Sequence, residues 1–277
     1  MSSVGTLRLP MHELAGSGAS TLIVAFVAGC AVAVVTAPVG VSGAVFLLPV
    51  QLDLLRVPSP AVTPTNLLYN LVATPGALLR YRRAGALDAR LTRQLLVGTV
   101  PGVVIGSIVR VYAAPGDREF RVLAAAVLLA LGGWLCTGRG IRTRPGWKTG
   151  RSLAIAGLLV GVVGGVYGIG GGSLLGPMLV GAGLAVTRVA PAALASTLVT
   201  SAVGVCSYAL LSLFTSGPVR PDWAVGISCG FGGLVGGYVG ARLQPRMPEA
   251  ALRAMLGAVA VGLAALYVLQ AAGLLRR

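Results

Sequence analysis

Long stretches without a charged residue constrain the fold of this chain more than any other feature. No Asp, Glu, Lys or Arg lies between Glu13 and Asp53, or between Arg151 and Arg188. Charged residues make up 10% of the 277-residue chain and apolar residues 56%, whereas soluble domains carry roughly 25% charged residues. These numbers disfavour a soluble domain and exclude a disordered chain, so they predict an all-α polytopic membrane protein.

The chain is also strongly basic, with 22 Lys and Arg against 7 Asp and Glu. The basic residues fall in short gaps between apolar stretches, which is typical of loops that flank membrane spans. We therefore expect no nucleic acid partner. Loops 80–93 and 139–151 carry five basic residues each, and we expect both to face the cytoplasm and to meet anionic lipid head groups.

Glycine-rich breaks divide the two longest uncharged stretches, one at residues 40–43 and one at residues 168–173. Glycine disfavours a helix interior by ~1 kcal/mol relative to alanine, so each break is expected to separate two helices. The second helix of each half is then too short to cross the bilayer. The predicted segments are 20–37, 43–55, 61–79, 91–111, 119–137, 151–167, 171–185, 188–213, 223–242 and 251–272.

The two halves of the chain resemble each other. The shift along the chain that places Gly40 on Gly168 also places Pro49 on Pro177, and we call it the first shift. Further along, the second half contains an insertion, so a longer shift is needed to match the halves, and we call it the second shift. It pairs Gly98 with Gly232, Gly102 with Gly236, and Gly106 with Gly240. The sequence thus predicts two homologous repeats of about five segments each, a common plan of transporters.

This plan divides the chain into a polar tail (1–19), a first membrane repeat (20–137), a basic cytoplasmic linker (138–150) and a second membrane repeat (151–277). Ten crossings would make the halves inverted and put both termini outside, whereas eight would make them parallel with both termini inside. Either way the cytoplasmic side carries 14 Lys and Arg and the other side 8. Charge bias does not choose between them, and we favour inverted repeats.

Two motifs carry a resemblance to a known family. One is G-I-G-G-G-S-L-L-G-P at 168–177, with a weaker copy at 40–49, and the other is G-x-x-P-G-x-x-x-G at 98–106. With this order and spacing the chain resembles the sulfite exporter TauE/SafE family of bacterial membrane permeases over about residues 20–272. It departs from the family pattern at Ser42 and Ala44, where glycines are common, and has Ala193 where the repeat has Thr65. The resemblance implies transport of small sulfur-containing anions such as sulfite or sulfonates.

The breaks are also the expected place for an anion, because helix N-termini offer unpaired N–H groups and a partial positive charge. If the halves are inverted, both breaks approach the midplane and flank one site. Polar side chains in the neighbouring apolar segments would complete it. The predicted substrate-binding residues are Gly40, Ser42, Gly43, Thr65, Asn66, Asn70, Gly170, Gly171, Gly172, Ser173, Ser196 and Thr197.

Each of these assignments has a structural alternative. The glycines would serve only to bring helices close together. Asn66 and Asn70, four residues apart on one helical face, would form interhelical hydrogen bonds. Ser196 and Thr197, with Thr200 and Ser201, would bond to their own helix backbone, which is the interpretation we favour for these hydroxyls.

Charged side chains are expected to stay at the ends of the spans. Asp53, Asp88 and Asp222 lie at segment ends, so no buried carboxylate is predicted for proton coupling. Arg56 and Arg110 are expected to extend toward lipid head groups.

Other classes of protein lack the residues they need. The only histidine is His12, and the four cysteines are scattered, so we predict no enzyme, no metal site and no cofactor. The sequence favours a multi-pass permease of the bacterial plasma membrane that moves sulfite or organosulfonates by alternating access. A passive anion channel, a transporter of another organic anion and a non-transporting scaffold remain alternatives, and a homo-oligomer is compatible with the sequence.

Overall fold

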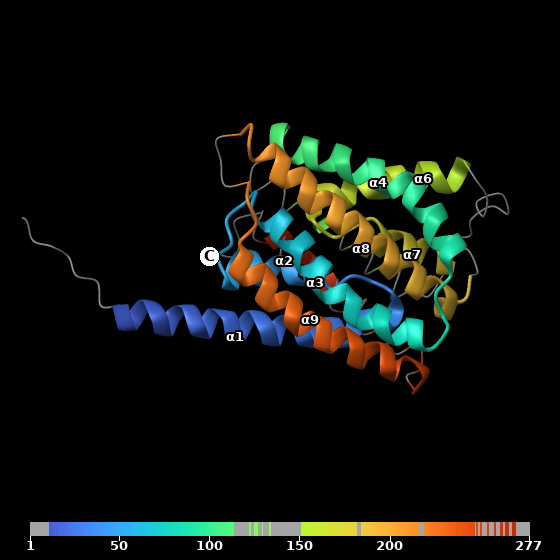
Figure 1. Cartoon of the computed structure of the whole chain (residues 1–277), viewed down its shortest axis with the longest axis horizontal. Coiled ribbons are helices and arrows are strands. Elements are labelled where there is room, and N and C mark those ends of the chain that lie inside the picture. Colours follow the sequence, from blue (N-terminus) through green and yellow to red (C-terminus); the bar gives the residue numbers. More distant parts are fainter. Residues whose placement is uncertain are drawn as a thin grey trace, which may run out of the picture.

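The computed structural model describes residues 11–113, 151–181, 184–215 and 219–246, with isolated positions in 122–133 and 248–269. All regular elements in these ranges are helical (Figure 1). Their bounds are α1 Met11–Thr36, η1 Ala37–Val39, α2 Ala44–Pro49, η2 Val50–Leu54, α3 Val62–Arg83, α4 Ala89–Tyr112, α6 Arg151–Tyr167, α7 Gly172–Gly181, α8 Val186–Leu211, α9 Trp223–Leu243 and η4 Gln244–Arg246.

Eight of the ten predicted segments correspond to these helices. Segment 151–167 has the bounds of α6, and segment 43–55 is the α2 helix continued by the π-helical η2. Segments 119–137 and 251–272, like the predicted linker 138–150, lie outside the continuously described residues. Helix α1 begins at Met11, within the predicted polar tail 1–19, and the apolar span that it contains begins at Gly18.

Among the residues that the structure describes, four helices are long and apolar enough to cross a membrane. They comprise residues 18–39, 89–112, 186–211 and 223–246. Large apolar side chains face outward on these and neighbouring helices: Ile23, Val97 and Leu159 are each 64% exposed. Polar side chains such as Asn66 are instead fully buried. An apolar exterior around a polar interior is the arrangement that a lipid environment requires.

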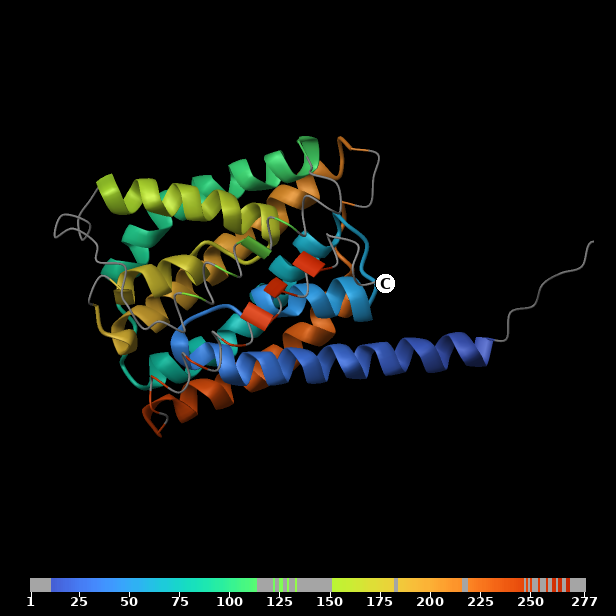
Figure 2. The same cartoon turned by 180° about the vertical axis from the view of Figure 1, so that it is seen from behind.

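Each predicted break is a real interruption between helices. Gly40 ends η1 with φ 74°, and Gly168 follows α6 with φ 72°. A positive φ is open to glycine but strained for other residues, so glycine allows the chain to leave the helix here. Figures 1 and 2 show α2 and α7 leaving the centre of the bundle in opposite directions, as α1 and α3 run opposite to α6 and α8.

Two glycine-lined contacts hold the bundle together, one between α4 and α6 and one between α9 and α1. A Cβ atom added at any of these glycines would overlap a main-chain carbonyl oxygen of the facing helix. The overlaps are Gly98 with Ala154, Gly102 with Leu158, Gly106 with Val162, Gly232 with Phe26, Gly236 with Cys30, and Gly240 with Val34. We call these two contacts the glycine seams.

The two glycine seams use matching positions. The second shift takes each glycine of the α4 seam to a glycine of the α9 seam, and the first shift takes each α1 carbonyl to an α6 carbonyl. The glycines of one seam therefore correspond to the glycines of the other, and the carbonyls that they contact correspond as well. Each seam joins a helix of the first half of the chain to a helix of the second, so the main helix contacts of this kind are made between the halves.

Candidate functional site

The two breaks meet at the centre of the bundle. The Ser42 amide donates a hydrogen bond to Ser173 Oγ at 3.3 Å, which links the first break directly to the start of α7. Asn70 of α3 joins both sides: its Nδ2 donates to the Gly168 carbonyl at 3.2 Å, and its Oδ1 accepts from the Ser42 hydroxyl. The expected convergence of the breaks is therefore observed.

Helix α3 turns one polar face toward this centre. Thr63, Asn66, Asn70 and Thr74 follow one another at intervals of three or four residues and are all buried, which places them on one side of the helix. Asn66 Nδ2 donates to the Ala44 carbonyl at 2.9 Å. Its Oδ1 has no hydrogen-bond partner among the described residues, although it is fully buried. Buried polar atoms are normally paired.

Hydroxyls of α8 cover the second break. Thr200 Oγ1 accepts from the Gly171 amide at 3.1 Å, and Thr197 Oγ1 lies 3.5 Å from Ser173 Oγ. Ser196 Oγ lies 3.3 Å from Thr99 Oγ1 of α4. Thr200 also bonds to the Ser196 carbonyl at 2.8 Å, so the predicted bond to its own helix is confirmed for Thr200. The break amides of Ser42 and Gly171 are thus held by hydroxyl groups in this conformation.

One predicted site residue, Thr65, faces away from the breaks, and two of the break glycines, Gly40 and Gly172, are in close packing contact with α8. Thr65 Oγ1 bonds to the Ala61 carbonyl and accepts from the Asp222 amide at 2.9 Å, which places it at the start of α9. An added Cβ at Gly40 would meet Ala190, and one at Gly172 would meet the Ala193 main chain. For these two glycines the geometry matches the packing alternative.

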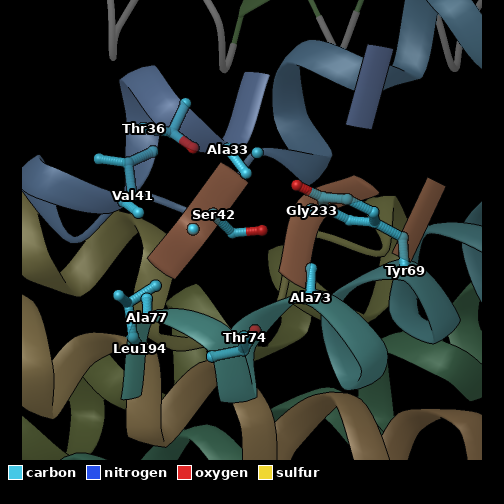
Figure 3. A pocket seen from close by; sticks show the side chains of 13 residues that line it. Ala33, Thr36, Val41, Ser42, Tyr69, Ala73, Thr74, Ala77, Leu194 and Gly233 are labelled. Atoms are coloured by element: carbon cyan, nitrogen blue, oxygen red, sulfur yellow. The ribbon is translucent and has the colours of Figure 1, made fainter. Parts of the chain in front are cut away.

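A small pocket opens beside the first break. It is lined by the end of α1, the break itself, the middle of α3, and a few residues of α8 and α9. The hydroxyls of Ser42 and Tyr69 point into it, with Thr74 nearby (Figure 3). Its volume is about 20 Å³, which is room for roughly one water molecule. An oxyanion is larger, so the pocket must widen before one can enter.

The described residues do not supply a metal site, since no three His, Cys, Asp or Glu side chains converge within them. Cys30, Cys206 and Cys229 are free thiols. The chemistry available at the breaks is hydrogen bonding by neutral amides and hydroxyls.

Comparison with known proteins identifies the family. The model of the family described as "Sulfite exporter TauE/SafE" matches residues 25–267. The chain belongs to the TauE/SafE family. Searches of curated proteins and of solved structures found no match. Members of the TauE/SafE family are membrane transporters of sulfite and related anions, so family membership indicates a membrane transport protein.

One cation of this TauE/SafE protein lies where the sequence did not predict it. Arg110, in the last turn of α4, is 1% exposed and does not extend to lipid head groups, whereas Arg56 is exposed. The Arg110 guanidinium donates to the hydroxyls of Ser59 and Thr63. The prediction for Arg110 was wrong because helices α3, α6 and α8 close over the end of α4, and no local pattern reports this.

Two of the three predicted carboxylates lie at helix starts, whereas Asp53 lies in η2. Asp88 caps α4 by accepting from the Leu91 amide at 2.9 Å, and Asp222 caps α9 by accepting from the Val225 amide at 3.0 Å. The Leu91 hydrogen bond, and then Arg188 at 2.7 Å, hold the pKa of Asp88 below its usual value. The second shift takes Asp88 to Asp222, which again matches the repeat.

The sequence did not single out three polar residues around the TauE/SafE breaks. Thr99 packs against Gly171, Thr63 donates to the Val166 carbonyl at 3.0 Å, and Thr74 lines the pocket. The spacing of Thr63 and Thr74 with the two asparagines was a usable signal. Thr99 had none, because it lies inside the glycine motif at 98–106, which was used only for the repeat and the family resemblance.

Proposed function

We propose that this protein is a saturable carrier that moves a small sulfur oxyanion, sulfite or an organosulfonate, across the bacterial plasma membrane. The observation that carries the proposal is the meeting of the two breaks at one buried centre, where Ser42 bonds to Ser173. Family membership supports the class of substrate. The apolar exterior supports a membrane location.

The proposed binding site consists of Ser42, Gly43, Asn66, Asn70, Gly170, Gly171, Ser173 and Thr197. Its donors are neutral, which suits a carrier because a neutral site holds an anion without trapping it. In the described conformation the hydroxyl oxygens of Ser173 and Thr200 accept hydrogen bonds from the amides at the breaks. An entering oxyanion would take the place of these hydroxyl oxygens as the acceptor of the amide protons, and the freed hydroxyls would donate to it.

We infer further that the two halves are inverted repeats. Support comes from similar hydrogen bonds in the two halves: Tyr81 donates to the Ala37 carbonyl at 3.1 Å, and Tyr208 to the Gly165 carbonyl at 2.8 Å. The first shift takes Tyr81 to Ala209, one residue from Tyr208. The first shift relates the two carbonyls. The matched glycine seams and the opposite directions of α2 and α7 point the same way.

Inverted halves explain how one site serves two sides. The pocket lies toward the end of α3 that carries Arg80, Arg82 and Arg83, which is the side expected to be cytoplasmic. Exchange of conformations between the halves would close this pocket and open its counterpart beside the second break. Such an exchange is alternating access around a fixed site.

The test is flux into proteoliposomes of the full chain, measured for sulfite, short sulfonates and carboxylates of matching size. We expect saturable uptake of a sulfur oxyanion, and we expect the unlabelled anion to compete with the labelled anion for uptake. Asn70→Asp should abolish it, because a carboxylate at the meeting point of the breaks repels the substrate. Gln51→Glu is the matched control, since Gln51 is equally buried but lies in η2, away from the breaks.

Each outcome decides between the candidate functions. Flux that rises linearly with concentration indicates a passive channel, and saturable flux of carboxylates alone indicates another organic anion. Flux that survives Asn70→Asp would place the site elsewhere. No flux of any anion above empty liposomes would reject the proposal and leave a scaffold role.

A further inference from the structure

A buried cation lies beyond the second break, and the proposed central site does not use it. Arg110 is among the largest side chains that are almost fully buried, at 1% exposure. It lies in the last turn of α4, whose first residue is Ala89. A helix of this length spans about 35 Å, so Arg110 lies at the end of the bundle opposite to the arginine-rich loop 80–93.

Arg110 is connected to the second break through hydroxyl groups. Its Nε donates to Thr63 Oγ1 at 3.4 Å, and its Nη2 donates to Ser59 Oγ. Thr63 in turn donates to the Val166 carbonyl at 3.0 Å, two residues before Gly168. The cation is therefore part of the same polar interior as the breaks.

The corresponding place in the second half carries no charge. The second shift takes Arg110 to Gln244, whose Nε2 donates to the Pro38 carbonyl. The first shift takes Pro38 to Val166. An uncharged side chain thus makes the equivalent link at the other end of the bundle, where it holds the fold without a positive charge. The two halves therefore differ in charge at this position, with Arg110 in the first half and Gln244 in the second.

A buried charge in a membrane protein is expensive, and it is retained where it acts on an ion or substrate. We propose that Arg110, together with the hydroxyls of Ser59 and Thr63, forms a second anion-binding station between the central site and the membrane face opposite to loop 80–93. A small oxyanion would occupy it before or after the central site. Guanidinium matches the oxygens of such anions in geometry as well as charge.

This inference rests on the proposed function, and two measurements keep them apart. The first is stabilisation of the purified full chain by sulfite, read as the rise in melting temperature with concentration, which reports binding whether or not transport occurs. The second is uptake into proteoliposomes. Both are made on wild type, Arg110→Gln, Arg110→Lys, Ser59→Ala and the control Arg56→Gln, which removes an exposed arginine near the same end of the bundle.

Arg110→Gln copies the residue at the equivalent position of the other half, so it removes the charge and keeps an N–H donor. We expect it to weaken sulfite binding at least tenfold and to raise the KM for uptake, while Arg110→Lys loses less and Arg56→Gln loses nothing. A structural role would lower the yield of folded protein without changing KM. If Arg110→Gln does not fold, Ser59→Ala is decisive, with binding expected to weaken two- to fivefold.

Wild-type affinity and KM in Arg110→Gln, or in Ser59→Ala where Arg110→Gln does not fold, would overturn the second station and leave the transport proposal standing. Sulfite binding that depends on Arg110 without flux in wild type would reject transport and keep the station. Neither binding nor flux in wild type would reject both.

Discussion

The glycine seam between α4 and α6 makes a quantitative prediction for Gly161→Ala. An alanine Cβ at position 161 would lie 2.6 Å from the Thr99 carbonyl oxygen and 2.9 Å from Thr99 Cα. Both are main-chain atoms, so the helices must separate by about 0.8 Å to reach the 3.4 Å of an ordinary contact. Overpacking of this kind destabilises by about 1–3 kcal/mol, and the gain in helix propensity of ~1 kcal/mol offsets part of it.

Gly237→Ala is the matched control. Gly237 is also a buried glycine inside a helix that faces another helix, but its added Cβ would meet its nearest neighbour, the Ala77 amide nitrogen, at 3.5 Å. Here only the gain in propensity remains, so this variant should be neutral or slightly stabilising.

The assay is thermal unfolding of the purified full chain in detergent. The middle of the overpacking range leaves a net cost of about 1 kcal/mol after the gain in propensity. With about 2–4 °C per kcal/mol for a chain of this size, Gly161→Ala should melt about 2–4 °C below wild type. Gly237→Ala should melt at or above wild type. If Gly161→Ala melts at or above wild type, or if both variants shift equally, close backbone contact at the seams is not what holds these helices together.

Two further predictions concern the ends of the bundle. In a chain whose native cysteines have been replaced, Ala73→Cys in the pocket should react with a membrane-impermeant thiol reagent from the side of loop 80–93. Its counterpart Ser201→Cys should react only from the other side and only with substrate present; labelling of both from one side would contradict inverted halves. At Asp88, whose pKa is lowered in the folded state, the stabilisation is present above about pH 4 and is lost as the pH falls through the lowered pKa. Asp88→Asn keeps the cap but not the ion pair with Arg188, so its deficit in melting temperature, at most about 1–3 °C, should shrink below about pH 4 and disappear once the pH is below the lowered pKa. A deficit that persists there would show that the ion pair is not its cause.

The sequence predicts the helices of this protein well because its signal is strong there. Uncharged stretches locate the spans, and the glycine clusters at 40–43 and 168–173 locate the breaks. The end of α3 was missed by four residues, since Arg80, Arg82 and Arg83 read as a loop although basic residues suit the last turn of a helix.

The site was less predictable because burial depends on packing between distant helices. The types of residue at Ser42, Asn70 and Ser173 suggested an anion site, and the structure brings them together. Thr65 is the same type of residue as Thr63 and lies only two positions away, but it is on another face of α3 and contacts the start of α9 instead. Arg110 is buried by three helices that are distant from it in the sequence, so the residues around Arg110 do not predict its burial.

The crossed packing of the halves also has a consequence for biosynthesis. The seam partner of α1 is α9, and the whole chain from Thr36 to Trp223 must be synthesised before that partner exists. At 5–20 residues per second this takes roughly 10–40 seconds, during which α1 sits in the bilayer with its seam facing lipid or a chaperone. Assembly of the protein therefore waits for its last helices, and a ribosome that stalls after α8 would leave an inserted but unassembled intermediate for quality control to remove.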